Sequence, residues 1–166
     1  AVEFLRGQER VTAVAIAGHS MGGSSAIMAA SQDPSIKAVV SFGAVAHPVP
    51  SVEAKRKEFV KDGDSYSLTI NDRTFRFSET FFSDATSIDP IAAVGSLQAP
   101  VLIVHGVDDD RIDLSEGKEL FLNASLPKSI KMIEGAKHRF EDHYEPLIKS
   151  TEKKKKMWLK EEKVED

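Results

Sequence analysis

Short runs of apolar residues alternate along the chain with stretches in which apolar positions recur every three or four residues. Four of the runs predict buried strands, at residues 11–17, 37–42, 101–104 and 130–133. A continuous apolar run is typical of a strand with both faces covered, as in a parallel sheet. Helical spacing follows the first and third runs, over 21–31 and 115–124. Strands that alternate with helices predict an α/β fold with a parallel sheet and helices on both faces.

Two segments do not follow this alternation. Residues 48–97 form a long insertion, in which alternating apolar positions on both sides of Asn71-Asp72 predict a β-hairpin. A short helix is expected around 89–94, at the end of the insertion. The tail predicts one more helix, from about 141 to about 163, with Tyr144, Leu147, Ile148, Thr151 and Trp158 on one face.

Composition excludes several classes of protein. The 166 residues suffice for one domain with a sizeable core, and the net charge of −4 argues against a nucleic-acid partner. No apolar run is long enough to cross a bilayer, so no membrane partner is expected. The absence of cysteine excludes disulfides, thiolate metal sites and cysteine nucleophiles, and is compatible with a cytoplasmic location.

Gly18-His19-Ser20-Met21-Gly22 lies where the first predicted strand meets the first helix. A serine at a sharp strand-to-helix turn projects its hydroxyl above the sheet, and the glycines two positions away are expected to avoid collisions of Cβ atoms with the backbone. The Met21 amide would then point at an oxyanion, and the helix N-terminus would add a favourable dipole. The alternative is a glycine-rich turn of purely structural role.

A serine hydroxyl is a weak nucleophile until a base removes its proton, and that base needs an acid to orient it. Both are expected after later strands, because the carboxyl ends of parallel strands share one edge of the sheet. The third strand continues into His105-Gly106-Val107-Asp108-Asp109-Asp110, and the fourth is followed by His138. The candidates therefore occur in the order Ser, Asp, His.

The segments GHSMGG, VLIVHGVDDDRID and IEGAKHRF resemble the nucleophile, acid and histidine motifs of α/β-hydrolases, and the insertion resembles the caps of feruloyl-esterase-like and acyl-peptidase-like members. The resemblance implies Ser20 as nucleophile, His138 as base, the Met21 amide as oxyanion donor and Asp109 as acid. Asp108 and Asp110 remain alternatives, whereas Asp113 lies too far along the loop and stands where the family often has proline.

The same resemblance implies a serine hydrolase that cleaves a small-molecule carboxylic ester through an acyl-enzyme and needs no cofactor. The other histidines, His19, His47, His105 and His143, show no metal-ligand spacing, so no metal site is expected. A peptidase or thioesterase on the same residues, and a non-catalytic binding module, remain alternatives. The phenylalanines of the insertion, Phe75, Phe77, Phe81 and Phe82, would either cap the site and favour an apolar acyl or aryl group or form the core of the insertion.

The chain departs from the family before its first predicted strand. Only residues 1–10 precede that strand, and they look like the end of a helix. An α/β-hydrolase has several earlier strands, and a loop among them supplies a second oxyanion amide. We therefore expect a partial hydrolase domain whose first strand is an open sheet edge, inviting a second copy of the chain. The source of the second oxyanion donor is left open.

Overall fold

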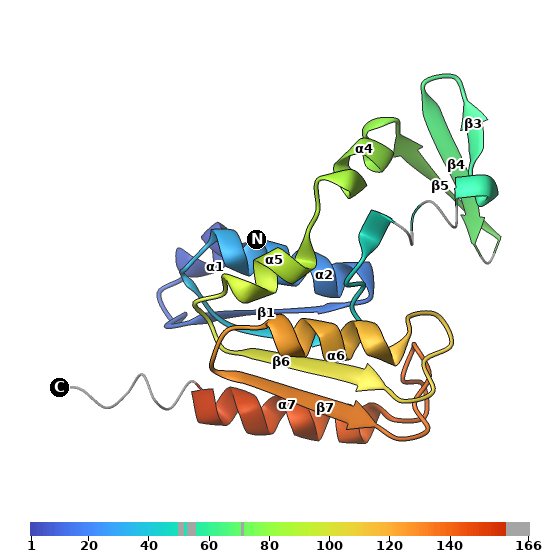
Figure 1. Cartoon of the computed structure of the whole chain (residues 1–166). Helices are drawn as coiled ribbons and strands as arrows, with labels where there is room; N and C mark the ends of the chain where they lie inside the picture. Colours follow the sequence, from blue (N-terminus) through green and yellow to red (C-terminus); the bar gives the residue numbers. More distant parts are fainter. Residues whose placement is uncertain (50–51, 53–55, 71, 159–166) are drawn as a thin grey trace. The chain divides into compact units, whose positions relative to one another are not determined.

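The computed structural model describes residues 1–49, 52, 56–70 and 72–158 (Figure 1). The chain divides into two compact units, of which the first comprises Ala1–Ala46 with Pro90–Asp166 and the second His47–Asp89. The predicted insertion over 48–97 therefore ends earlier than expected, because α5 (Pro90–Gly95) packs into the core of the first unit. None of the helices in the described ranges is long and apolar enough to cross a membrane.

The first unit is built on a four-stranded sheet with the spatial order β1-β2-β6-β7. Its strands are Val14–His19, Ile36–Phe42, Val101–Gly106 and Lys128–Ile133, and all pairs are parallel. Every residue of β6 is buried, which explains why its sequence is a continuous apolar run. The predicted parallel sheet is confirmed. The first strand begins later than expected, because Val11 lies in a turn and donates its N–H to Gln8.

Helices cover both faces of this sheet (Figure 1). On one face, α2 (Met21–Gln32), α5 and α6 (Leu114–Asn123) enclose a core that includes Ile27, Val94 and Leu120. The short helix α1 (Val2–Arg6) precedes β1, in agreement with the helical end expected there. On the other face, α7 (Tyr144–Trp158) packs Leu147 against a smaller core. This arrangement leaves the carboxyl ends of the strands free for loops.

The tail helix differs from its prediction in one respect. Leu147 contacts the core, but Tyr144 and Ile148 are each 54% exposed, so the predicted apolar face is only partly buried. The helix begins later than expected because His143 donates its N–H to Phe140 in the turn before it. The side chain of Trp158, and residues 159–163 of the predicted helix, lie outside the described residues.

The second unit is a small antiparallel sheet with a helix. The predicted hairpin is present as β4 (Ser65–Ile70) and β5 (Arg73–Ser78), although Asn71 of its turn lies outside the described residues. A third strand, β3 (Val60–Asp62), a 3₁₀ helix (Arg56–Glu58) and α4 (Thr80–Thr86) were not expected from the sequence. These three elements are short, and short elements carry little periodicity.

The phenylalanines of the insertion form its own core. Phe82 is buried, and the rings of Phe77 and Phe81 lie 4.8 Å apart, with Phe59 and Tyr66 completing the cluster. Aromatic pairs in such tilted and edge-to-face arrangements stabilise a small core beyond their buried area. Phe75, by contrast, is 46% exposed on β5. The core interpretation therefore holds for Phe77, Phe81 and Phe82.

The open edge of β1 generates the first prediction. Along a strand, the N–H groups of successive residues point alternately toward and away from the neighbouring strand. Ser20 donates its N–H to the carbonyl of Phe42, so the N–H groups of Ile16 and Gly18 also face β2. Those of Ala15 and Ala17 face away from it. We propose that a second copy of the chain pairs with this edge. Ala17→Pro removes an edge donor without breaking the bonds to β2, and we expect it to abolish self-association of the chain in light scattering across a concentration series.

The matched control is Ala17→Val, which keeps the N–H and should self-associate like the wild type. Self-association that is unchanged in Ala17→Pro, or a wild-type chain that stays monomeric over the whole series, would contradict the proposal.

Candidate active site

Ser20 stands alone between the last residue of β1 and the first of α2, in a strained conformation with φ 57° and ψ −128°. Such a backbone costs about 1–3 kcal/mol and persists only where its surroundings enforce it. The constraint on Ser20 comes from the close approach of the backbones of Gly18 and Gly22, since a Cβ at Gly18 would lie 2.0 Å from the carbonyl oxygen of Gly22. The turn is therefore so tight that only glycine fits at Gly18.

The expectation that Gly22 avoids a collision is wrong, because a Cβ at Gly22 would meet no atom within 4 Å. The close approach lies one residue later. A Cβ at Gly23 would come within 2.9 Å of the Ala44 Cβ and 3.2 Å of the Ser41 Oγ. Gly23, which is buried, is thus the position that lets α2 lie close to the sheet.

Asp109 lies in the loop after β6, and its side chain has no exposed surface. One carboxylate oxygen, Oδ1, accepts the backbone N–H groups of Arg111 and Ile112, each at 2.9 Å. The other, Oδ2, lies 2.9 Å from Nδ1 of His138. Arg111 and Ile112 belong to the same loop as Asp109, so the backbone of this loop fixes the orientation of the carboxylate.

The pKa of the Asp109 carboxyl lies below its ordinary value. Burial, the largest influence, raises the pKa, but hydrogen bonds from Ile112, His138 and Arg111 together with the charge of His138 lower it by more. Asp109 is therefore ionised at neutral pH. An ionised carboxylate can only accept, so Nδ1 of His138 carries the hydrogen of their bond.

His138 lies in the loop after β7, and its Nε2 is 3.0 Å from the Oγ of Ser20. With the hydrogen on Nδ1, a neutral ring leaves Nε2 free to accept from the Ser20 hydroxyl. The loop approaches β6 closely, because a Cβ at Gly106 would lie 2.2 Å from the carbonyl oxygen of Ala136. Asp108 donates its N–H to that same oxygen. The structure thus brings Ser20, His138 and Asp109 into one hydrogen-bonded chain.

The neighbouring aspartates lie elsewhere. Asp110 reaches the backbone N–H of His138 at 3.5 Å but does not contact the imidazole ring, and Asp108 is exposed. Asp113 caps α6 by accepting the N–H of Ser115 at 2.8 Å. Of the three candidates for the acid, Asp109 is the one in contact with Nδ1 of His138.

The remaining histidines have different surroundings. His105 is fully buried, with its Nε2 3.0 Å from the carbonyl oxygen of Ile112 and 3.3 Å from Oδ2 of Asp109. It therefore supports the loop that carries Asp109. His47 belongs to the second unit. His143 is half-buried beside Gly135.

The Met21 amide is in the first turn of α2, where N–H groups have no acceptor within the helix. It follows Ser20 directly and adds the positive end of the helix dipole. This is the position expected for an oxyanion donor. The Met21 side chain is 53% exposed.

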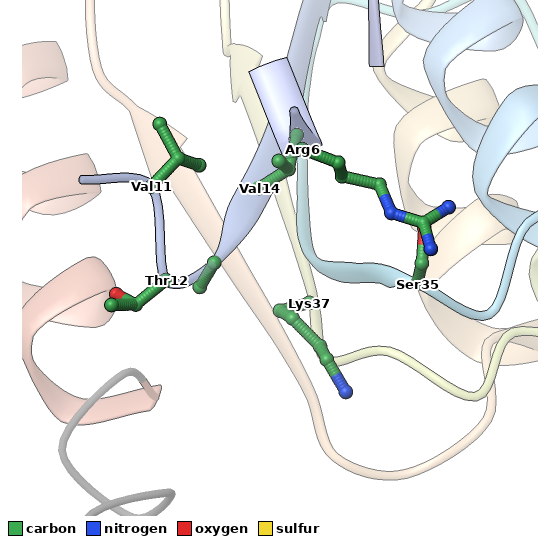
Figure 2. Close-up of a pocket in the computed structure, with 7 residues that line it drawn as sticks. Arg6, Val11, Thr12, Val14, Ser35 and Lys37 are labelled. Carbon is green, nitrogen blue, oxygen red and sulfur yellow. The ribbon is translucent and has the colours of Figure 1, made fainter. Parts of the chain in front are cut away.

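A cavity of about 270 Å³ lies at the opposite end of β1 from Ser20 (Figure 2). It is lined by Arg6, residues 11–14, Ser35 and Lys37. The six residues of β1 span about 20 Å between the cavity and Ser20, so this cavity is not part of the site. Within the part of the chain that the structure describes, no three His, Cys, Asp or Glu side chains could together hold a metal ion.

Comparison with known proteins gives one family and one fold. The sequence model of the prolyl oligopeptidase family matches residues 1–161. An uncharacterized protein of Bacillus subtilis, YqkD, is 32% identical over 54 residues, which is 32% of this chain and 18% of that protein.

Solved structures with the same fold are esterases and peptidases. The esterase domain of a Rhodothermus marinus protein has a TM-score of 0.68 and 26% identity over 85% of this chain and 58% of its own. Est1E of Butyrivibrio proteoclasticus with bound ferulic acid has a TM-score of 0.80 and 22% identity over 95% of this chain and 64% of its own. An acylaminoacyl peptidase of Pyrococcus horikoshii has a TM-score of 0.58 and 17% identity over 84% of this chain and 22% of its own.

The expected α/β-hydrolase fold is confirmed by these likenesses. The chain spans 58% and 64% of the lengths of the first two structures, so it corresponds to about three-fifths of each.

The turn at Ser20 leads to a prediction with a built-in control. Gly18→Ala places a methyl group 2.0 Å from a backbone oxygen, and we expect it to lower the free energy of unfolding in urea by about 3 kcal/mol. Gly22→Ala adds the same methyl group where nothing lies within 4 Å, and should stay within about 0.5 kcal/mol of the wild type. Equal losses in the two variants would mean that the turn is not as tight as described.

The lowered pKa of Asp109 leads to a second prediction. A carboxyl whose folded pKa lies below its unfolded value of about 3.9 stabilises the fold above that pH, and the contribution disappears as pH falls through the folded pKa. Asp109→Asn should therefore be less stable than the wild type at pH 7, by about 1–3 kcal/mol. The difference should shrink below about pH 4 in urea titrations at a series of pH values.

Asp108→Asn is the control, because Asp108 is exposed and does not contact His138. A gap between Asp109→Asn and the wild type that stays constant down to the lowest pH would show that ionisation of Asp109 does not stabilise the fold.

Proposed function

The chain belongs to the prolyl oligopeptidase family, and from that premise we propose that it is a serine hydrolase that cleaves carboxylic esters through an acyl-enzyme. One observation carries the proposal. The Ser20 Oγ, the two ring nitrogens of His138 and Oδ2 of Asp109 form a continuous chain with contacts of 3.0 and 2.9 Å. In a Ser-His-Asp catalytic triad, these are the contacts that activate the serine hydroxyl.

In the first step, the Ser20 Oγ attacks the ester carbonyl carbon while Nε2 of His138 takes the hydroxyl proton. The carbonyl oxygen becomes an oxyanion and accepts the Met21 N–H. When the tetrahedral intermediate collapses, the bond to the leaving alkoxide breaks, and Nε2 returns the proton to it. The products of this step are a free alcohol and an acyl group on Ser20.

In the second step, water replaces the alcohol. Nε2 of His138 removes a proton from water as its oxygen attacks the acyl carbon, and then returns that proton to the Ser20 oxygen as the acyl bond breaks. Asp109 remains ionised throughout, holds the proton on Nδ1 and stabilises the imidazolium that forms twice per cycle. Neither step needs a cofactor.

Small-molecule esters are the proposed substrates, and the support comes from two similar structures. One is described as an esterase domain, and the other, Est1E, holds ferulic acid, an aromatic acid. Their likeness supports an apolar or aryl acyl group. We propose a cytoplasmic location, with which the absence of cysteine is compatible.

Peptide hydrolysis is the second candidate, because the family is named for an oligopeptidase and one similar structure is an acylaminoacyl peptidase. The triad activates serine in the same way for esters, thioesters and amides, so it does not choose between them. An amide needs its nitrogen protonated to leave, whereas an ester expels an alkoxide more readily. Ester cleavage is therefore the less demanding reaction for these residues.

Covalent labelling tests the proposal directly. An alkyl fluorophosphonate should add one phosphonyl group to the wild-type chain, as measured by intact mass, and none to Ser20→Ala. Ser25→Ala is the matched control, since Ser25 is an exposed serine of the same helix and should leave labelling unchanged. Labelling that persists in Ser20→Ala would refute the assignment of the nucleophile.

Asp109→Asn should lower ester turnover by about 10⁴, whereas Asp108→Asn and Asp110→Asn should stay within about threefold.

A substrate panel then separates the two candidate functions. Hydrolysis of p-nitrophenyl esters of increasing acyl length is compared with hydrolysis of aminoacyl anilides on the same enzyme. A kcat/KM for the esters that exceeds that for the anilides by more than tenfold supports the esterase. The reverse order supports the peptidase and contradicts the proposal.

A further inference from the structure

His19 contacts the loop that carries His138, although it precedes it by more than a hundred residues. Its Nε2 lies 2.7 Å from the carbonyl oxygen of His138. A carbonyl oxygen only accepts, so Nε2 of His19 carries the hydrogen and donates it. His19 is the last residue of β1, directly before Ser20, so the strand that presents the nucleophile also holds the backbone of the base.

Two ring contacts accompany this hydrogen bond. The centroid of the His19 ring lies 4.7 Å from that of His138, with the planes tilted by 44°. The His19 ring also meets Phe140 edge to face, with centroids 6.2 Å apart. His19 therefore contacts the carbonyl of His138, the ring of His138 and the residue two positions farther along.

The loop needs such support because its backbone is strained. Phe140 has φ 55°, in the left-handed region that favours glycine, and yet its side chain is only 2% exposed and packs in the core below α7. Arg139 alone separates this residue from His138. A displacement of the His138 backbone would carry the imidazole away from the Ser20 Oγ, and the bond from His19 to the His138 carbonyl opposes that displacement.

We propose that His19 is a positioning residue of the hydrolase, which keeps Nε2 of His138 within proton-transfer distance of Ser20. The proposal rests on the proposed function. His19 touches none of the reacting atoms, and it takes no part in proton transfer. It acts through the hydrogen bond by which its Nε2 holds the backbone carbonyl of His138.

Two variants separate the hydrogen bond from the packing. His19→Phe keeps an aromatic ring between His138 and Phe140 but removes the donor, whereas His19→Gln keeps an N–H at the position of Nε2 and removes the ring. His19 is exposed, so neither change opens a cavity in the core. Both variants are expected to unfold in urea at the wild-type midpoint.

The first readout is the rate of ester hydrolysis. Loss of one positioning hydrogen bond should lower kcat about threefold to tenfold in His19→Phe with KM unchanged, because substrate binding does not involve His19. His19→Gln should recover to within about twofold of the wild type. A kcat for His19→Phe equal to that of the wild type, or equal losses in both variants, would overturn the proposal.

The second readout does not depend on turnover. In histidine-selective ¹H–¹⁵N spectra of the free chain, the Nδ1 proton of His138, shared with Asp109, should exchange with water faster in His19→Phe than in the wild type and in His19→Gln. Unchanged exchange would refute the positioning role. If the wild-type chain neither hydrolyses esters nor reacts with the fluorophosphonate, the proposed function fails, and the spectra alone decide whether His19 holds the His138 ring.

Discussion

The close approach of β1 to the first turn of α2 is the constraint on which the site depends. At Gly18 the two backbones are too near for any side chain, and Ser20 is held with a positive φ as a result. An unconstrained serine would relax into an ordinary extended or helical conformation and would turn its hydroxyl toward the sheet or the helix. The buried face of α2, which packs on the sheet through Gly23 and Ile27, supplies the energy that keeps the strain in place.

Asp109 and His138 are positioned by the neighbouring strands in a comparable way. Parallel strands end at one edge, so the loops after β6 and β7 meet beside the turn that holds Ser20. Gly106 allows these two loops to touch, because its missing side chain makes room for the Ala136 carbonyl. The carboxylate of Asp109 is then fixed by two backbone N–H groups and by Nδ1 of His138.

Most of this arrangement could be predicted from the sequence, and the parts that could not have physical reasons. Short continuous apolar runs predicted the sheet, and the resemblance of three motifs to those of α/β-hydrolases predicted that Ser20, Asp109 and His138 would meet. The short strand β3 and helix α4 carry too few residues for periodicity to show. The roles of Gly22 and Gly23 depend on how closely two elements pack, and the contact of His19 with His138 joins distant segments through a backbone carbonyl. The spacing of residues within one segment predicts neither the closeness of this packing nor the contact of His19 with His138.

Phe140 places two opposing demands on a single position. Its backbone conformation is the one that glycine adopts without cost, whereas its side chain fills a site in the core that glycine would leave empty. No standard amino acid satisfies both demands, so a design that relaxes this loop has to change a second position at the same time. The conformation of the loop is thus a compromise between torsional energy and packing, and a substitution at 140 that removes the torsional strain by introducing glycine empties the core at the same position.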